Sequence, residues 1–373
     1  MLVFALLMAF ASGSASGLVV GATRTAVADG SRAIGTLTAS QLAGQHVIYS
    51  YSGLTPPAKL LTLISHGEAA GVIFFGDNIV GHAQISKVVA KLERADASSG
   101  NPVRAPLLLM TDQEGGLVRR LSGPPSLSEK QIGAAADPAA AATAAGSGAG
   151  RNLRSVGMNV NLAPVLDVYR QAGDFDDHEG RSYSTSPAVV SALGADFISA
   201  QQRLGVAATA KHFPGLGAAT RAQDTDLRPV TLDLSQRTLT TVDELPYKAA
   251  IAAGVRLVMV SWAVYPAFDR GVPAGLSSTI ILGQLRQQLG FQGVTISDAL
   301  EAGALRAFGS VPQRAVLATT AGIDLVLCSD GHVSEGEEAM AALESGYQAG
   351  RLPKSAFRAS VQRVVALRSS LGS

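Results

Sequence analysis

The sequence predicts an α/β protein, a (β/α)8 TIM-like barrel folded as a single domain. Eight short apolar runs with the composition of β-strands alternate with longer segments of helical periodicity at fairly even spacing. Near-continuous apolar strands separated by helices are typical of parallel strands that are covered on both faces. Such units in 373 residues fit the barrel, whose usual length is about 250 residues before insertions. A doubly wound sheet is the alternative, but no glycine-rich phosphate-binding sequence follows the first strand.

The predicted elements follow one another in strand–helix order. Strands are predicted at residues 46–51, 71–75, 106–112, 159–168, 206–213, 256–262, 293–298 and 323–328. Helices are predicted between them, at residues 83–94, 139–156, 187–204 and 279–289. The alanine-rich segment 134–149 is interpreted as a surface helix, because Ala is the best helix former. The amphipathic segment 354–371 is predicted to be the closing helix, and no low-complexity linker divides the chain.

The composition argues against several function classes. Hydrophobic residues make up 47% of the chain and charged residues 16%, which is typical of a globular protein, and the formal net charge is +1. No block of Lys and Arg stands out, so neither nucleic acid nor an acidic membrane surface is predicted as a partner. The single cysteine, Cys328, lies in an apolar run and is predicted to be buried and unreactive. There is no Cys–His cluster with metal-ligand spacing.

The N-terminus has the pattern of a targeting segment. Residues 2–10 are apolar, small residues follow, and Ala26-Val27-Ala28 offers a cleavage pattern before Asp29. Residues 1–28 are therefore predicted to be a signal peptide, or an uncleaved anchor, since the first Arg comes only at position 24. Residues 29–373 are predicted to form the catalytic barrel of a secreted or cell-envelope protein. No later stretch is long and apolar enough to span a bilayer.

Charged side chains stand where the predicted strands end. The stretch VTISD ends in Asp298, and the other strand ends carry Asp112, Glu114, Asp167, Lys211, His212, Ser261 and Trp262. In a (β/α)8 barrel these carboxyl ends converge on the catalytic face. Carboxylates and cations would bind sugar hydroxyls there, and Trp262 would stack on a ring face. The alternatives are that Asp298 caps the next helix and that the other residues only solvate loops.

Several motifs are similar to those of one enzyme family and come in the same order. They are GVIFFGDNI, TDQEGGLVRRL, GMNVNLAPVLDV, GRSY, KHFPG, ELPYKAAIAAG, MVSWAVYPAFD, LRQQLGFQGVTISD and AGIDLVL. The chain thus resembles the glycoside hydrolase family 3 β-N-acetylhexosaminidases of cell-wall turnover, from about Gly71 to Cys328. The resemblance implies a TIM-like barrel and a carbohydrate substrate, with no metal ion and no organic cofactor.

The resemblance also implies roles for individual residues. Asp298 corresponds to the nucleophile that forms a glycosyl–enzyme intermediate. The residues implied to hold the sugar are Asp112, Arg120, Arg181, Lys211 and His212. A retaining mechanism needs one ionised carboxylate beneath the anomeric carbon and a proton donor on the leaving oxygen. Lys211 is expected to lie near Asp298 and to keep it ionised.

The chain departs from the family after KHFPG. In the family this motif is followed by His-Gly and then, on a mobile loop, by Asp-Ser-His, whose His is the acid/base. Here Leu216 replaces the first His, Asp224-Thr225-Asp226 stands roughly where Asp-Ser-His would be, and no His occurs between His212 and His332. Ala299 also replaces the Asp beside the nucleophile, and the family's Ser-His before Tyr-Pro has become Ser261-Trp262.

Three consequences of this departure stay open. In the first, Asp226 or Asp224 is itself the acid/base, because a carboxylic acid can protonate a leaving oxygen if its pKa is raised. In the second the donor is His178 or Glu179, and in the third the protein only binds glycans. The sequence therefore predicts a retaining exo-β-glycosidase acting on terminal β-N-acetylhexosamine. A non-catalytic glycan-binding protein and a β-glucosidase on the same barrel are the alternatives.

Overall fold

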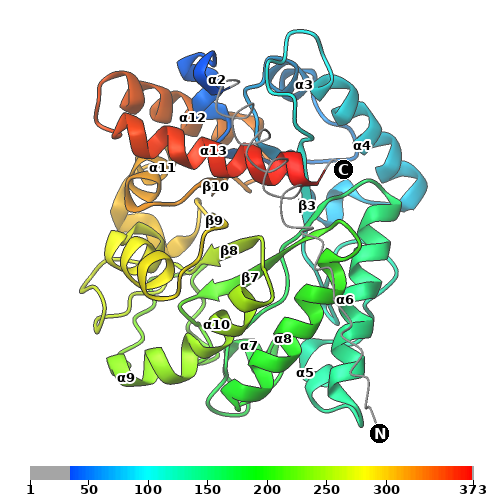
Figure 1. Ribbon diagram of the computed structural model, residues 1–373, viewed down its shortest axis with the longest axis vertical. Helices are drawn as coiled ribbons and strands as arrows, with labels where there is room; N and C mark the ends of the chain where they lie inside the picture. The colour runs from blue at the N-terminus through cyan, green and yellow to red at the C-terminus, as the bar shows by residue number, and fades with distance from the viewer. Residues whose placement is uncertain (1–33, 372–373) are drawn as a thin grey trace, which may run out of the picture.

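The computed structural model describes residues 34–371, and the predicted leader 1–28 lies outside the described residues (Figure 1). Eight parallel strands close into a barrel in the order β1-β10-β9-β8-β7-β6-β3-β2. Their bounds are β1 (Val47–Tyr49), β2 (Gly71–Ile73), β3 (Leu108–Thr111), β6 (Val160–Asn161), β7 (Ala207–Phe213), β8 (Leu257–Val260), β9 (Val294–Ala299) and β10 (Leu325–Leu327). Each coincides with one of the eight predicted runs, β9 ending one residue later, so the predicted (β/α)8 barrel is confirmed.

Helices surround the barrel. The α-helices are α2 (Ala39–Gly44), α3 (Ala58–Ser65), α4 (His82–Asp96), α5 (Glu129–Gly133), α6 (Pro138–Ser155), α7 (Phe175–His178), α8 (Pro187–Gln202), α9 (Gln236–Thr238), α10 (Leu245–Ala252), α11 (Val311–Ala321), α12 (Val333–Gln348) and α13 (Lys354–Ser370). Shorter or wider turns are η1 (Gly76–Asn78), η2 (Leu239–Asp243), η3 (Ala274–Leu276), η4 (Thr279–Gln288) and η5 (Gly303–Phe308). A small antiparallel pair, β4 (Gln113–Gly115) and β5 (Val118–Arg119), follows β3. No helix of the described residues is long and apolar enough to cross a membrane.

Two of the predicted helices differ from expectation in detail. The predicted helix 279–289 is the π-helical segment η4. The alanine-rich segment becomes helical only from Pro138, because Asp137 caps the helix by accepting a hydrogen bond from the Ala140 N–H at 3.0 Å. One face of this helix is buried rather than exposed, since a Cβ at Gly146 would lie 2.3 Å from the Phe197 carbonyl oxygen of α8.

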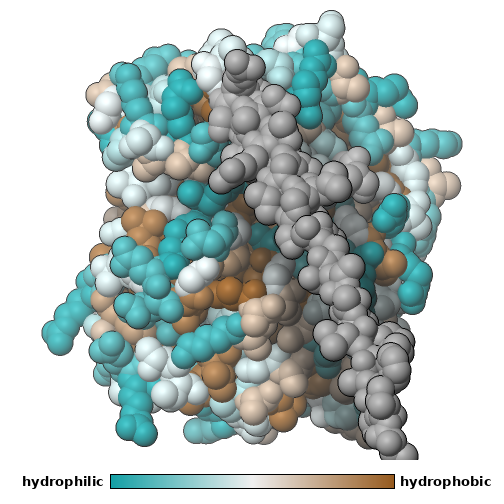
Figure 2. Space-filling model, in the orientation of Figure 1, coloured by the Kyte–Doolittle hydropathy of each residue, from teal (hydrophilic) through white to brown (hydrophobic). Residues whose placement is uncertain are grey.

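The strands divide their side chains between two layers by simple alternation. In β8, Leu257 and Met259 belong to the cluster inside the barrel, and Val258 and Val260 pack outward against the helices. Both layers are fully buried, as expected for parallel strands covered on both faces. Helix α13 adds apolar side chains to the inner cluster and lies across one end of the barrel (Figure 1). Figure 2 shows the molecule from the same side, and the side chains around the edge of this view are mostly polar.

A buried carboxylate ties α13 to the barrel. Asp324, at the start of β10, accepts hydrogen bonds from Arg363 of α13 at 2.7 Å, from Arg286 at 2.6 Å and from Ser360 at 2.7 Å. Burial raises the pKa of Asp324, but hydrogen bonds from Arg363 and the charges of Arg363 and Arg286 outweigh it and lower the pKa below its usual value. The carboxylate therefore stays charged at neutral pH in the folded protein.

We expect Asp324→Asn to lower the free energy of unfolding at pH 7 by about 3–5 kcal/mol, the usual cost of removing one partner of a buried ion pair. Because the folded-state pKa lies below the unfolded value of about 3.9, this stabilisation is present above that pH and is lost as the pH falls through the folded value. Urea titrations should show a smaller difference in the free energy of unfolding between wild type and variant near pH 3 than at pH 7. Asp233→Asn, at an exposed carboxyl, is the control; equal losses in both variants at pH 7 would contradict the assignment.

Candidate active site

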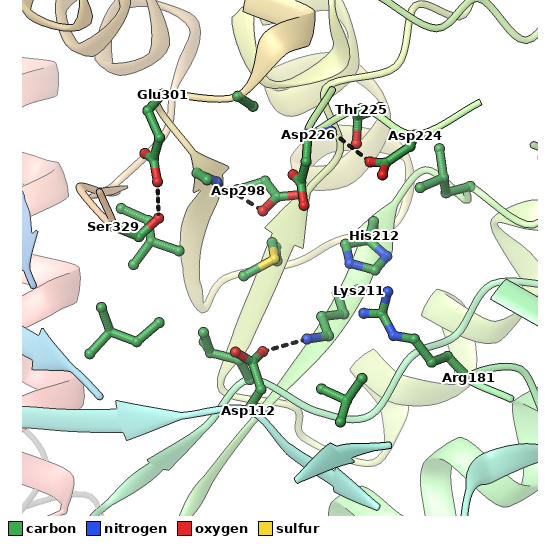
Figure 3. A pocket seen from close by; sticks show the side chains of 18 of the residues that line it. Asp112, Arg181, Lys211, His212, Asp224, Thr225, Asp226, Asp298, Glu301 and Ser329 are labelled. Atoms are coloured by element: carbon green, nitrogen blue, oxygen red, sulfur yellow. Dashed lines mark hydrogen bonds and ion pairs between the residues drawn. The ribbon is translucent and has the colours of Figure 1, made fainter. Parts of the chain in front are cut away.

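A cavity of about 420 Å³ opens at the carboxyl ends of the barrel strands. Figure 3 shows the side chains that reach into it from β3, β7, β9 and the loops that follow them. Eight of the nine residues predicted for the site line this cavity, and they are Asp112, Arg120, Arg181, Lys211, His212, Asp224, Asp226 and Asp298. The ninth, Trp262, does not. Strands that are far apart in the sequence therefore bring the predicted charges to one place.

Asp298 lies near the end of β9, and its half-buried carboxyl faces the cavity. Its Oδ1 accepts a hydrogen bond from the Ala299 N–H at 2.8 Å. The alternative that Asp298 caps the next helix is wrong, because that helix, η5, begins at Gly303 with Ala302 at its N-cap. The Asp298 carboxyl group is therefore not engaged in capping η5.

Glu114 organises the cations on the opposite side of the cavity. Its buried carboxylate accepts two hydrogen bonds from Arg181, both at 2.9 Å, and lies 2.7 Å from the Lys211 ammonium. Lys211 also donates to Asp112 at 2.9 Å. Burial raises the pKa of Glu114, but the charges of Arg181 and Lys211 outweigh it and lower the pKa to about 2. The sequence placed Glu114 at a strand end without including it in the site, and its position two residues after Asp112 is the signal that would have found it.

The expectation that Lys211 directly keeps Asp298 ionised is not supported. The ammonium of Lys211 is paired with Asp112 and Glu114. Burial lowers the pKa of Lys211, yet the charges of these two carboxylates raise it overall, so it stays protonated. The lysine consequently serves the far side of the cavity from Asp298.

His212 is held in one orientation by a buried carboxylate. Its Nδ1 lies 2.7 Å from Asp167 Oδ2, and the same carboxylate accepts hydrogen bonds from the N–H groups of His212 and Leu216. Burial lowers the pKa of His212, but the hydrogen bond to Asp167 and the charges of Asp167 and Asp298 raise it overall. With Nδ1–H donated to Asp167, Nε2 is the ring nitrogen left for a ligand.

Asp226 faces Asp298 across the cavity, and their carboxyl groups point toward one another (Figure 3). The charge of Asp298, followed by burial and the charge of Asp224, raises the pKa of Asp226 to about 7. Asp224 Oδ1 accepts a hydrogen bond from the Asp226 N–H at 2.9 Å, which bends the loop between them. Of the other donors considered, His178 and Glu179 are about 40% exposed and do not line the cavity.

Trp262 does not form the expected aromatic wall. Its side chain is only 1% exposed, belongs to the outer core, and donates its indole N–H to the Ala299 carbonyl at 2.8 Å. Strand alternation explains the error, because Trp262 has the parity of the outward-facing Val258 and Val260. Apolar side chains that include Ile73, Phe75 and Leu327 line the cavity instead. Trp262 thus supports the end of β9 from behind.

Two cavity-lining polar residues were missed by the sequence reasoning. Glu301 and Ser329 lie on the other side of Asp298 from Asp226 (Figure 3). The Ser329 hydroxyl donates to Glu301 Oε1 at 2.6 Å. Ser329 follows Leu327 by two residues, and Leu327 faces the barrel interior, so strand alternation would have found it. Glu301 is in a turn, where no such periodicity applies.

One group among the described residues has the proximity needed for metal ligands, namely Asp167, Asp176 and His212, whose ligand atoms lie within 4.8 Å of one another. His212 Nδ1 is already paired with Asp167. The Arg181 guanidinium lies 3.7 Å from Asp176 Oδ1 and competes with a cation for its charge. These two contacts explain why the three side chains lie close together: Asp167 positions His212, and Asp176 positions Arg181.

A (β/α)8 barrel whose C-terminal face holds facing carboxyl groups beside a cluster of charged side chains is an arrangement found in glycoside hydrolases. The chain belongs to glycoside hydrolase family 3: the model of the "Glycosyl hydrolase family 3 N terminal domain" matches residues 39–367. Its substrate is therefore a carbohydrate.

Individual relatives agree with this assignment. The chain is 45% identical over 331 residues to a secreted glycosyl hydrolase of Arthroderma benhamiae, covering 88% of this chain and 93% of that one. It is 34% identical over 292 residues to a β-hexosaminidase of Stenotrophomonas maltophilia, covering 75% and 82%. A family 3 β-N-acetylglucosaminidase of Paenibacillus superposes with a TM-score of 0.85 at 36% identity. That match covers 90% of this chain and 63% of the longer Paenibacillus chain.

We expect Glu114→Gln to lower the free energy of unfolding at pH 7 by about 3–5 kcal/mol, because Arg181 and Lys211 would lose their shared counter-charge while buried. Glu129→Gln is the matched control. Glu129 is also buried, but burial and the charge of Glu114 raise its pKa well above the usual value, which favours the uncharged form that glutamine imitates. The control should change stability by about 1 kcal/mol or less. Equal urea midpoints for the two variants would refute the role of Glu114.

Proposed function

We propose that the chain is a retaining exo-β-glycosidase that hydrolyses terminal β-N-acetylhexosamine residues through a glycosyl intermediate on Asp298. The observation that carries this proposal is the Asp226–Asp298 pair, in which the charge of one carboxyl group raises the pKa of the other to about 7. A retaining glycosidase needs such an unequal pair, one ionised nucleophile and one protonated acid. The similarity to β-hexosaminidases supports the choice of sugar.

The two chemical steps use the same two carboxyl groups. In the first, the Asp298 carboxylate attacks the anomeric carbon while the glycosidic C–O bond breaks and Asp226 gives its proton to the leaving oxygen. In the second, the Asp226 carboxylate takes a proton from water, whose oxygen attacks the anomeric carbon and displaces Asp298. The proton on Asp226 and the charge on Asp298 are then both restored.

The electrostatics of the pair change in the direction that this cycle needs. Asp298 is negatively charged in the free enzyme and raises the pKa of Asp226, which keeps Asp226 protonated as an acid. Once Asp298 is esterified by the sugar, it no longer carries a negative charge. The principal cause of the raised pKa of Asp226 is then absent. Asp226 then loses its proton more easily, as the base of the second step must.

The remaining charges would hold the terminal sugar. Asp112, Lys211, Arg181 and His212 line the cavity as a fixed set of donors and acceptors, and the exposed Arg120 stands at its edge. The cavity, at about 420 Å³, lies in the range of small-ligand sites.

We also propose that residues 1–28 direct export and that 29–373 form one catalytic domain, acting outside the cytoplasm on glycans such as those of a cell wall. The apolar leader supports this, as does similarity to a secreted hydrolase. Cell fractionation of the full chain, followed by N-terminal sequencing of the product, tests it. Retention of the intact leader in a cytoplasmic fraction would refute export.

Asp298→Ala should reduce turnover of an aryl β-N-acetylglucosaminide to background, because no group remains to attack the anomeric carbon. Azide should restore turnover and give the α-glycosyl azide, since it enters from the face that Asp298 occupied. Product anomers are read by NMR. The non-catalytic alternative predicts instead that wild-type protein binds the sugar without turnover, and the β-glucosidase alternative predicts that the aryl glucoside is the better substrate.

Asp226→Asn should lower kcat/KM for substrates with poor leaving groups by about 10²–10⁴-fold, the usual worth of general acid catalysis, and affect activated aryl substrates far less. Azide should now yield the β-glycosyl azide. Because Asp226 must be protonated and its pKa is about 7, wild-type kcat/KM should fall as the pH rises through 7. In the variant this decrease of kcat/KM above pH 7 should be absent. Asp224→Asn is the control; if it shows these effects in place of Asp226→Asn, the acid is Asp224.

A further inference from the structure

Two backbone hydrogen bonds join the Asp224–Asp226 loop to the segment that follows the nucleophile. The Gly303 N–H donates to the Asp226 carbonyl at 2.7 Å, and the Ala304 N–H donates to the Thr225 carbonyl at 3.0 Å. Gly303 and Ala304 open the helical turn η5, whose first N–H groups have no partner within the turn. The loop supplies the missing acceptors and is thereby attached to the same segment that carries Asp298.

This contact leaves no room for a side chain at Gly303. A Cβ there would lie 2.2 Å from the Leu227 carbonyl oxygen, 2.4 Å from its carbon and 2.9 Å from the Asp226 carbonyl oxygen. All three are backbone atoms, which cannot rotate away as the end of a side chain could. The φ of Gly303 is not in the left-handed region, so the requirement is for space and not for an unusual conformation.

The loop is also fixed from within. Thr225, between the two aspartates, is only 5% exposed, and Asp224 Oδ1 accepts the Asp226 N–H. The backbone on both sides of the Asp226 side chain is therefore bonded, and the carboxyl group is directed at Asp298 (Figure 3). Since charge interactions weaken with distance, the effect of Asp298 on Asp226 depends on the loop staying in this position.

We propose that Gly303 is a positioning residue that docks the Asp224–Asp226 loop on the segment after β9 and so holds the acid/base opposite the nucleophile before substrate arrives. This inference rests on the proposed role of Asp226. It contrasts with the mobile acid/base loop that the family resemblance implies, and it makes the space at position 303 a requirement for proton transfer.

The test compares Gly303→Ala with Gly283→Ala, a control whose new Cβ would meet nothing within 4 Å. In Gly303→Ala we expect kcat/KM for alkyl or disaccharide leaving groups to fall by about 10²–10⁴-fold and that for a dinitrophenyl leaving group by less than about threefold. Azide should raise kcat and yield the β-glycosyl azide, as in Asp226→Asn. The ratio of the two kcat/KM values does not depend on the fraction of folded protein, so a loss of stability cannot imitate the effect.

The outcomes separate the inference from the proposed function. If Gly303→Ala retains the leaving-group ratio of Gly283→Ala while Asp226→Asn does not, the docking role is wrong and the acid/base assignment stands. If Asp226→Asn itself retains the ratio, the assignment of the acid/base is wrong. Should Gly303→Ala not fold, hydrogen exchange in the wild-type protein decides. A docked loop slows exchange at the Gly303 and Ala304 amides by about a hundredfold or more, and unprotected exchange there would overturn the inference.

Discussion

Repulsion between two carboxyl groups at the mouth of the barrel, those of Asp226 and Asp298, is the interaction on which the proposed chemistry depends. Two buried carboxylates beside the cavity are paired with basic side chains: Arg181 and Lys211 contact Glu114, and His212 is bonded to Asp167. Among residues 34–371 no basic side chain forms an ion pair with the Asp226 carboxyl, whose pKa is raised chiefly by the charge of Asp298. A neighbouring negative charge of this kind raises the pKa of a carboxylic acid toward neutrality.

The barrel allows the pKa values of the carboxyl groups to differ because it places the charged residues on or after different strands. Asp112 follows β3, Lys211 lies in β7 and Asp298 in β9, so their separation is set by the closed sheet rather than by flexible loops. Strands packed on both faces are rigid, and rigid elements hold catalytic groups in place. The proposed acid/base, Asp226, is the exception, because it lies on a loop and needs other contacts to fix it.

The sequence was sufficient for the parts of the molecule that depend on local periodicity. Eight apolar runs became eight strands, and strand parity accounts for Asp112, Lys211 and Asp298, which have the same parity as Leu108, Ala207 and Ile296 of the inner cluster. The same parity places Trp262 outward, and neglect of it produced the wrong aromatic wall. The spacing of two residues from Asp112 indicates Glu114 as a site residue, but its pairing with Arg181 and Lys211 could not be predicted, because these partners come from other elements and the pairing depends on tertiary distances.

If the Asp224–Asp226 loop has the proposed role, a different residue type has taken over proton transfer from the histidine of the family's Asp-Ser-His. A histidine has a pKa near neutrality by itself, whereas an aspartate needs its pKa raised by several units. An aspartate acid is therefore useful only if it is held close to the nucleophile's charge. Contact between Gly303 and the Leu227 carbonyl brings the two segments that close together. On the proposed role of Asp226, an aspartate at this place in the loop and the absence of a side chain at Gly303 serve the same requirement, a short distance between the two carboxyl groups.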